Sequence, residues 1–154
     1  MAAKRPYSET TLIPLVEAAL KAISEQGGYN HTVRAVLAWD SNGYQYSGAR
    51  PAIRYLSSPE VYAQGEQVSA MVVAWTLRLF LYSDYDPEKG EPQNTQEARF
   101  RFDVAQAVSS ADWDSVTASR PRIAPTIDEE MPSQAVVDLE FSYQVDANDL
   151  SQAV

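Results

Sequence analysis

The sequence contains no cysteine and a single histidine, His31. Without cysteine, disulfide bridges, thiolate nucleophiles and cysteine-ligated zinc are excluded. One histidine cannot form a metal cluster by itself, and it can serve in a catalytic triad only as the base. His31 follows Gly27, Gly28 and Asn30, and this setting favours a structural histidine in a loop or at the start of a strand.

Long apolar runs and an excess of basic residues are also missing. No stretch of about 18 apolar residues occurs, which excludes a membrane-spanning helix, and residues 1–11 are not followed by the apolar core of a signal peptide. The chain has 12 basic and 21 acidic residues and a net charge of −9. It therefore lacks the basic stripe that binds nucleic acid through counterion release. We expect a protein that is cytoplasmic when synthesised.

The chain does have the length and the apolar content of one folded domain. Its 154 residues are 45% hydrophobic, and a chain of this size can bury about two-thirds of its unfolded surface. We expect a single domain over residues 1–154, with a tail at 147–154 that is flexible unless a neighbouring molecule holds it.

Two helices are predicted from apolar residues at three-and-four spacing. The first begins near residues 11–13, where Pro14 fits the first turn, and is stopped by Gly27 and Gly28. The second covers residues 95–110, with Asn94 and Glu97 at capping-box spacing. Its apolar stripe is expected to be Ala98, Phe102, Ala105 and Val108, with Arg99, Asp103 and Gln106 on the other side.

Alternation of apolar and other residues predicts five strands. They cover residues 31–39, 51–58, 67–83, 122–127 and 135–146. The connection DSNGYQYSGARP turns at Asn42-Gly43, loops cover residues 59–66 and 84–94, and Pro121 and Pro125 confine the fourth strand to an edge. The element order α-β-β-β-α-β-β predicts an α+β domain, with a mainly antiparallel sheet and two helices packed on it.

The strand SAMVVAWTLRLFLYS has bulky residues on both faces. Every second residue from Met71 to Leu81 is apolar, so this face belongs in the core. The other face carries Arg78, Phe80 and Tyr82, and it would expose more apolar area than a monomer usually shows. We therefore expect these three residues at a subunit interface, with Arg78 paired to a carboxylate across it. The alternative is that a helix of the same chain covers this face.

Motifs of enzymes are not recognisable, since the glycine-rich phosphate loops and the nucleophile elbow are missing. Acidic clusters occur at residues 84–88, 112–114 and 128–130. DYDPEKGEP begins like a calcium loop but lacks the remaining ligands, so a hydrated acidic loop is the preferred interpretation. DEEMP at 128–132 either pairs with arginines of a neighbouring copy or keeps a turn hydrated. The aromatic residues are assigned to core and interface packing, because no cations are interleaved with them as in a base-stacking groove.

In element order and in four passages, the chain resembles the tail terminator proteins of long-tailed bacteriophages, and more loosely their tail-completion and neck proteins. The passages are LIPLVEAALKAI, ARPAIRYL, VSAMVVAWTLRLFLYS, and EARFRFDVAQAV leading to AVVDLEFSYQV. The resemblance implies a small α+β subunit that forms a hexameric ring at the head-proximal end of the tail tube. Such a ring ends tube polymerisation and contacts the tube protein and the head–tail connector. The family has no enzyme activity and no cofactor, and its place is the virion after assembly in the host cytoplasm.

The acidic balance agrees with a ring lumen through which DNA passes without binding. The residues expected to face this lumen are Asp84, Asp86, Asp138 and Glu140. Two alternatives stay open. One is a small ligand-binding or catalytic domain, with a helix over a curved sheet, in which Trp75 and the tyrosines form a pocket and Asp138 or His31 is the polar group. The other is a tail tube or baseplate subunit, whose rings stack indefinitely.

Overall fold

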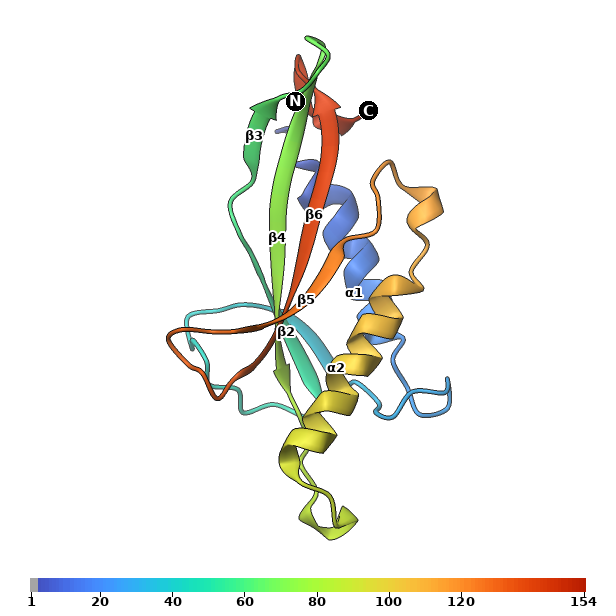
Figure 1. Cartoon of the computed structure of the whole chain (residues 1–154), viewed down its shortest axis with the longest axis vertical. Coiled ribbons are helices and arrows are strands. Elements are labelled where there is room, and N and C mark those ends of the chain that lie inside the picture. The colour runs from blue at the N-terminus through green and yellow to red at the C-terminus, as the bar shows by residue number, and fades with distance from the viewer. Residues whose placement is uncertain (1–2) are drawn as a thin grey trace.

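A long two-stranded ribbon organises the fold. In the computed structural model, which describes residues 3–154, β4 (Ala70–Tyr82) pairs antiparallel with β6 (Ala135–Asp146). The pairing runs from Ala70 opposite Asp146, here called the upper end, to Leu81 opposite Ala135 at the lower end. The 13 residues of β4 exceed the roughly 3–10 residues of most strands. The ribbon therefore sets the long axis of the molecule (Figure 1).

Five shorter strands extend the ribbon on both sides. Beside β4, β2 (Ala52–Ser57) pairs with its lower half and β3 (Val61–Gln64) with its upper half, while β1 (Ala35–Ala38) lies parallel to β2. Beside β6 are β5 (Arg122–Ile127) and β7 (Asp149–Ala153). The result is a seven-stranded, mainly antiparallel sheet.

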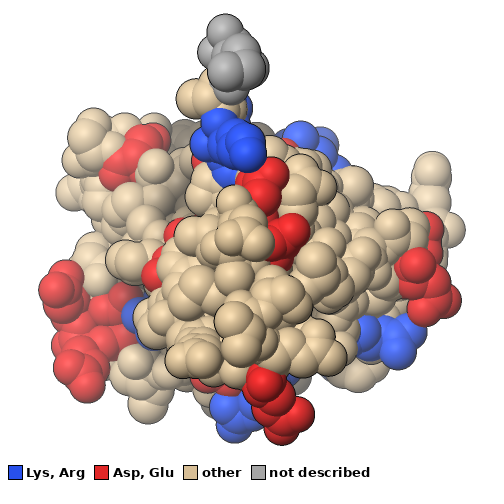
Figure 2. Space-filling model, turned by 90° about the horizontal axis from the view of Figure 1, so that it is seen from above, with Lys and Arg blue, Asp and Glu red and all other residues tan. Residues whose placement is uncertain are grey.

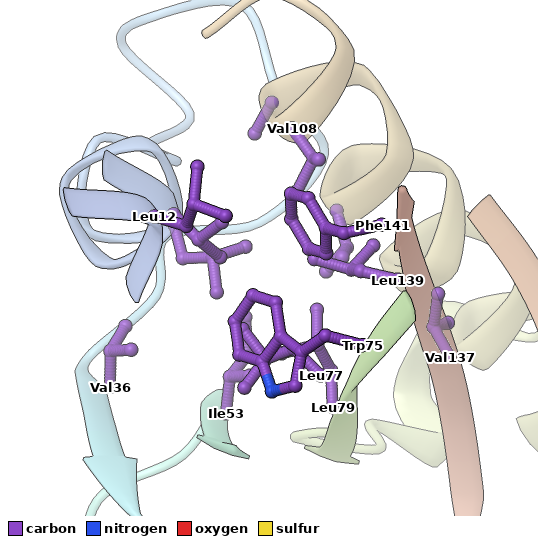
Figure 3. Packing of buried hydrophobic residues seen from close by; sticks show 14 of the residues in the cluster. Leu12, Val36, Ile53, Trp75, Leu77, Leu79, Val108, Val137, Leu139 and Phe141 are labelled. Atoms are coloured by element: carbon purple, nitrogen blue, oxygen red, sulfur yellow. The ribbon is translucent and has the colours of Figure 1, made fainter. Parts of the chain in front are cut away.

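Both helices lie on one face of this sheet (Figure 1). A π-helical turn at Ser8–Leu12 continues into α1 (Ile13–Lys21), and α2 (Gln93–Ser109) follows β4, with short 3₁₀ turns at Pro87–Lys89 and Trp113–Ser115. The apolar sides of the helices meet the inner face of the ribbon, where Trp75 and Phe141 pack together (Figure 3). Within residues 3–154, no helix has the length and apolarity needed to cross a membrane.

The predicted α+β class is confirmed, and several elements lie where they were expected. β6 has the predicted bounds, and the proline-bearing strand β5 lies at the edge of the sheet. Residues 59–66 do not form only a loop. β4 extends beyond the end of β2, and β3 pairs with the part of the β4 edge that β2 does not reach. Residues 149–153 are not a flexible tail either, since they form β7 against β6, and Lys4 Nζ lies 3.0 Å from Asp149 Oδ2.

The first helix ends before the predicted glycine stop. It ends at Lys21, and Ile23 leaves the helix to become part of the core at 1% exposure. The glycine stop acts instead on a separate turn, in which Gly28 has the left-handed φ of 95°. The first strand is also shorter than expected, because only residues 35–38 pair with β2.

The second helix is present, but most of its predicted apolar stripe faces outward. The buried residues include Phe100 and Val104, whereas Phe102 is 63% exposed. Two polar residues, Gln96 and Asp103, are buried instead because other parts of the chain supply their hydrogen-bond partners. Only one residue of the predicted apolar stripe, Val108, is buried. The other three, Ala98, Phe102 and Ala105, are not.

Candidate interaction surface

The outer face of the sheet, opposite the helices, carries the residues expected at a subunit interface. At the lower end, Phe80 and Tyr82 are only 1% and 3% exposed. The connection at 39–51 of the same chain covers them: the Trp39 and Phe80 ring centroids are 4.3 Å apart, and those of Tyr46 and Tyr82 are 5.0 Å apart. The expectation that a second copy covers Phe80 and Tyr82 is therefore wrong, and the cover is a loop rather than the helix of the alternative.

The buried guanidinium of Arg54 holds this loop against the sheet. Arg54 is 1% exposed, and a buried charge is costly unless it is paired and hydrogen-bonded. Its Nη2 donates to Asp40 Oδ1 at 2.7 Å, and its Nη1 donates to the carbonyls of Gly43 and Gln45 and to the Tyr82 hydroxyl. The Trp39 ring lies 4.5 Å from the guanidinium carbon, within cation–π range. The loop thus takes the shape that satisfies Arg54.

Arg78 pairs within the chain and not across an interface. Its Nε and Nη2 donate to the two carboxylate oxygens of Asp138 at 2.8 and 3.0 Å, a bidentate geometry. The two residues are directly opposite each other on β4 and β6. Arg78 Nη1 also lies 3.4 Å from Asp128 Oδ2. Asp138, expected to face a lumen, is therefore neutralised, and its side chain is only 14% exposed.

Asp128 connects this ion pair to the covering loop. Its Oδ1 accepts hydrogen bonds from the Tyr44 hydroxyl at 2.8 Å and from the backbone N–H groups of Glu130 and Met131. Burial alone would raise the pKa of Asp128, but these hydrogen bonds and Arg78 outweigh it, so the pKa lies below its usual value. The hydrogen bond to Asp128 is the main cause that raises the pKa of Tyr44 to about 12.

The other acidic residues expected at a lumen do not gather at one place. Glu140, higher on β6, lies 2.5 Å from Arg122 Nη1 and its side chain is 42% exposed. Asp86 accepts a hydrogen bond from the Glu88 N–H at 2.9 Å and caps the 3₁₀ turn. Asp84 is exposed just beyond the lower end of β4.

The upper half of the outer face is open and uncharged between Asp146, opposite Ala70 at the top, and Glu140, opposite Thr76 below. The strand registers place six neutral side chains there, from β3, β4 and β6. None of them is buried, and Val61 is 62% exposed. Seen from above, this end of the molecule is largely without charged residues, apart from adjacent basic and acidic groups near the middle and further charged groups around the rim (Figure 2). The six residues, here called the upper outer face, are Val61, Ala63, Val72, Ala74, Ser142 and Gln144.

A groove separates the two loops at the lower end. Trp39 and Tyr44 line one side of it and residues 126–130 the other, with Leu56, Arg78 and Phe80 between them. Its volume is about 710 Å³. Leu56 is 40% exposed, so the groove offers accessible apolar surface next to acidic residues.

His31 and Asp103 form a buried pair that links the segment after α1 to α2. Asp103 is 1% exposed and accepts hydrogen bonds from the backbone and side chain of Asn30 and from the backbone of His31, while His31 Nδ1 lies 3.0 Å from its Oδ2. A catalytic His–Asp pair needs a nucleophile at the other ring nitrogen. Over residues 3–154, no hydroxyl is hydrogen-bonded to that nitrogen. The pair therefore fixes a loop in place.

The residues of the predicted ligand pocket do not converge. Trp75 is 2% exposed in the core and its Nε1 donates to Ser57 Oγ at 2.8 Å, on the side of the sheet opposite Asp138. His31 lies beside α2. Trp75 and Asp138 therefore lie on opposite faces of the sheet and cannot line one pocket, and Trp75 is too deeply buried to face a ligand together with His31. In the part of the chain that the structure describes, no group of three or more histidine and carboxylate side chains could hold a metal ion.

Sequence reasoning missed the covering loop and the Asp103 hydrogen bonds. The loop had a signal, because Trp39, Tyr44 and Tyr46 are three aromatic residues in a turn-rich connection and Arg54 interrupts an otherwise apolar strand. Asp103 had none, since its partners are about 70 residues away along the chain. In comparisons with known proteins, neither a protein-family model nor a curated protein matches the chain.

Proposed function

We propose that the protein is a ring-forming structural protein of a bacteriophage tail, of the terminator or neck type. The upper outer face is the observation that carries this proposal. It is open and uncharged, and it lies beside the edges of β3 and β7, which have no further strand partner in residues 3–154. Open apolar faces and free strand edges suit association with other chains.

A ring requires contacts between two different surfaces of the same subunit. Such head-to-tail contacts close into a ring when the rotation from one subunit to the next divides a full turn. The outer face and the helical face lie on opposite sides of the subunit (Figure 1), as a head-to-tail arrangement needs. The element order adds support, because it agrees with the small α+β subunit that the resemblance implies.

The charge of the chain fits the passage of DNA through such a ring. The net charge is −9, which disfavours binding to phosphates. Of the residues expected at the lumen, Asp138 and Glu140 are paired with Arg78 and Arg122, and Asp86 caps a turn. Asp84 is exposed and in no ion pair of residues 3–154, so it is the proposed lumen carboxylate.

Native mass spectrometry and electron microscopy of negatively stained protein test the proposal together. We expect one closed multimer, seen as single rings, for the protein alone or mixed with tail tube protein. Filaments of stacked rings would instead identify a tube subunit. A protein that stays monomeric both alone and with tube protein would overturn the proposal.

A further inference from the structure

Phe102 is a large apolar side chain exposed on the outside of α2. The other three phenylalanines, Phe80, Phe100 and Phe141, are at most 3% exposed, but Phe102 is 63% exposed. With 3.6 residues per turn, Phe102 is about 200° around the helix from Phe100. Because Phe100 faces the sheet, Phe102 points directly away from it.

The surroundings of Phe102 are small and basic. Ala98 and Ala105 lie one turn away on the same side of the helix, and neither is buried. Arg99 and Arg101 flank this side. Arg99 pairs with Glu91 at 2.6 Å, whereas Arg101 has no carboxylate partner within residues 3–154, and its buried Nε makes no hydrogen bond. We call Ala98, Phe102 and Ala105, with Arg101 beside them, the α2 stripe.

The groove on the opposite face has the complementary character. Leu56 and Trp39 supply apolar and aromatic surface. Glu129 and Glu130 are exposed at its rim, and neither has a basic partner among the residues that the structure describes. The volume of about 710 Å³ exceeds that of an aromatic ring together with a guanidinium group.

We propose that the α2 stripe of one copy docks in this groove of the next copy, with Phe102 against Leu56 and Trp39, and Arg101 paired with Glu129 or Glu130. The helix and the two loops that line the groove lie on opposite sides of the sheet (Figure 1). Each copy therefore offers one half of the contact on each side, which gives a head-to-tail interface. This inference rests on the proposed ring and names a contact between neighbouring subunits in addition to the upper outer face.

Complementary variants test the inference, because a head-to-tail contact has two separate halves. Phe102→Asp destroys the stripe and leaves the groove intact, and Leu56→Asp does the reverse. Each variant alone is expected to weaken association at least about tenfold, as central apolar contacts do, and to give monomers where the wild type gives rings. Leu37→Asp is the matched control, because Leu37 is 46% exposed on β1 and belongs neither to the groove nor to the upper outer face, so its change should leave the rings intact.

Mixing the two variants gives the sharpest result. The intact stripe of Leu56→Asp can enter the intact groove of Phe102→Asp, so native mass spectrometry should show heterodimers that do not grow further. Since Leu56→Asp could disturb β2, the double variant Glu129→Arg and Glu130→Arg repeats the test on exposed residues. It should dissociate the rings, and adding Arg101→Glu should restore them.

The outcomes separate this inference from the proposed function. Rings that persist in both Phe102→Asp and the Glu129/Glu130 variant would overturn the inference and leave the ring proposal standing. If Phe102→Asp forms rings but no longer binds tube protein, the inference is also wrong and the ring proposal stands, because the stripe would then contact the tube protein and not another copy. Folded monomeric variants that form no heterodimer when mixed would also contradict it. A monomeric wild type, alone and with tube protein, would remove both proposals.

Discussion

The outer face of the sheet differs sharply between its two ends. At the lower end, Phe80 and Tyr82 are covered by residues 39–51 of their own chain. At the upper end, no segment of residues 3–154 buries Val61, Val72 or Ala74. Large aromatic groups are costly to expose, and at the lower end the chain covers them itself, whereas the small and neutral groups of the upper end can stay open until a partner arrives. The comparison shows that bulky residues on both faces of a strand do not by themselves identify an interface.

The largest difference between the two ends is expected in stability. Phe80→Ala removes a fully buried ring and should lower the free energy of unfolding by about 3–5 kcal/mol. Val61→Ala, on the upper outer face, should change it by less than about 0.5 kcal/mol. Urea unfolding of both variants measures this. If both variants lost the same free energy of unfolding, Phe80 at the lower end would not be packed more tightly than Val61 at the upper end, which would contradict the comparison.

Arg54 is the next most sensitive residue of the lower end. Arg54→Ala leaves the carbonyls of Gly43 and Gln45 and the Tyr82 hydroxyl without their donor, and leaving such acceptors unsatisfied costs about 1–3 kcal/mol. The loop should then detach from Phe80 and Tyr82, so the variant should bind a hydrophobic dye more strongly. Arg34→Ala is the control, because Arg34 is exposed and in no ion pair of residues 3–154. An unchanged dye response in Arg54→Ala would contradict the role of Arg54.

Asp103 should have an intermediate effect, away from the outer face. Asp103→Ala leaves the donors of Asn30 and His31 without an acceptor in a buried site, at a cost of about 2 kcal/mol. Amide hydrogen exchange at Asn30 and His31 should become faster. Exchange in β4 and β6 should become faster only to the extent that the free energy of global unfolding falls. Unchanged exchange at Asn30 and His31 would show that Asp103 does not fix this segment.

The smallest effect concerns acid stability at the junction of the two ends. The pKa of Asp128 is lowered below its usual value of 3.8, so the folded state binds its proton less tightly than the unfolded chain. The resulting stabilisation is present above about pH 4 and is lost as the pH falls through the lowered pKa. Asp128→Asn should therefore lose less stability than the wild type between about pH 4 and pH 2. Parallel acid-unfolding curves would contradict this.

The sequence was most informative where burial follows a simple period. Alternation over 135–146 predicted β6 with its observed bounds, and the prolines predicted the edge position of β5. β3 and β7 could not be predicted, because strands of four and five residues owe their pairing to a longer neighbour. The side of α2 that faces the sheet was also predicted wrongly. Its buried side includes Gln96 and Asp103, whose partners lie in other segments.

The surface was less predictable than the fold. Arg78 was correctly expected to form a bidentate pair with a carboxylate, but its partner lies opposite it on β6 and not on another copy. The covering loop depends on hydrogen bonds from Arg54 to backbone carbonyls. The aromatic residues of the connection and Arg54 signal that the loop packs on the sheet, but no pattern of side chains records bonds to backbone carbonyls, so the exact position of the loop could not be predicted.

Hydroxyl-radical footprinting over a range of protein concentrations tests most directly whether another copy meets the open residues of the outer face or the aromatic residues that the chain's own loop covers. Val61 and Phe102, at 62% and 63% exposure, should react in dilute protein and become protected as the protein assembles. Phe80 and Tyr82 should stay unreactive at every concentration. If Phe80 and Tyr82 instead react in dilute protein and become protected on assembly while Val61 stays reactive, this assignment of the two ends is wrong.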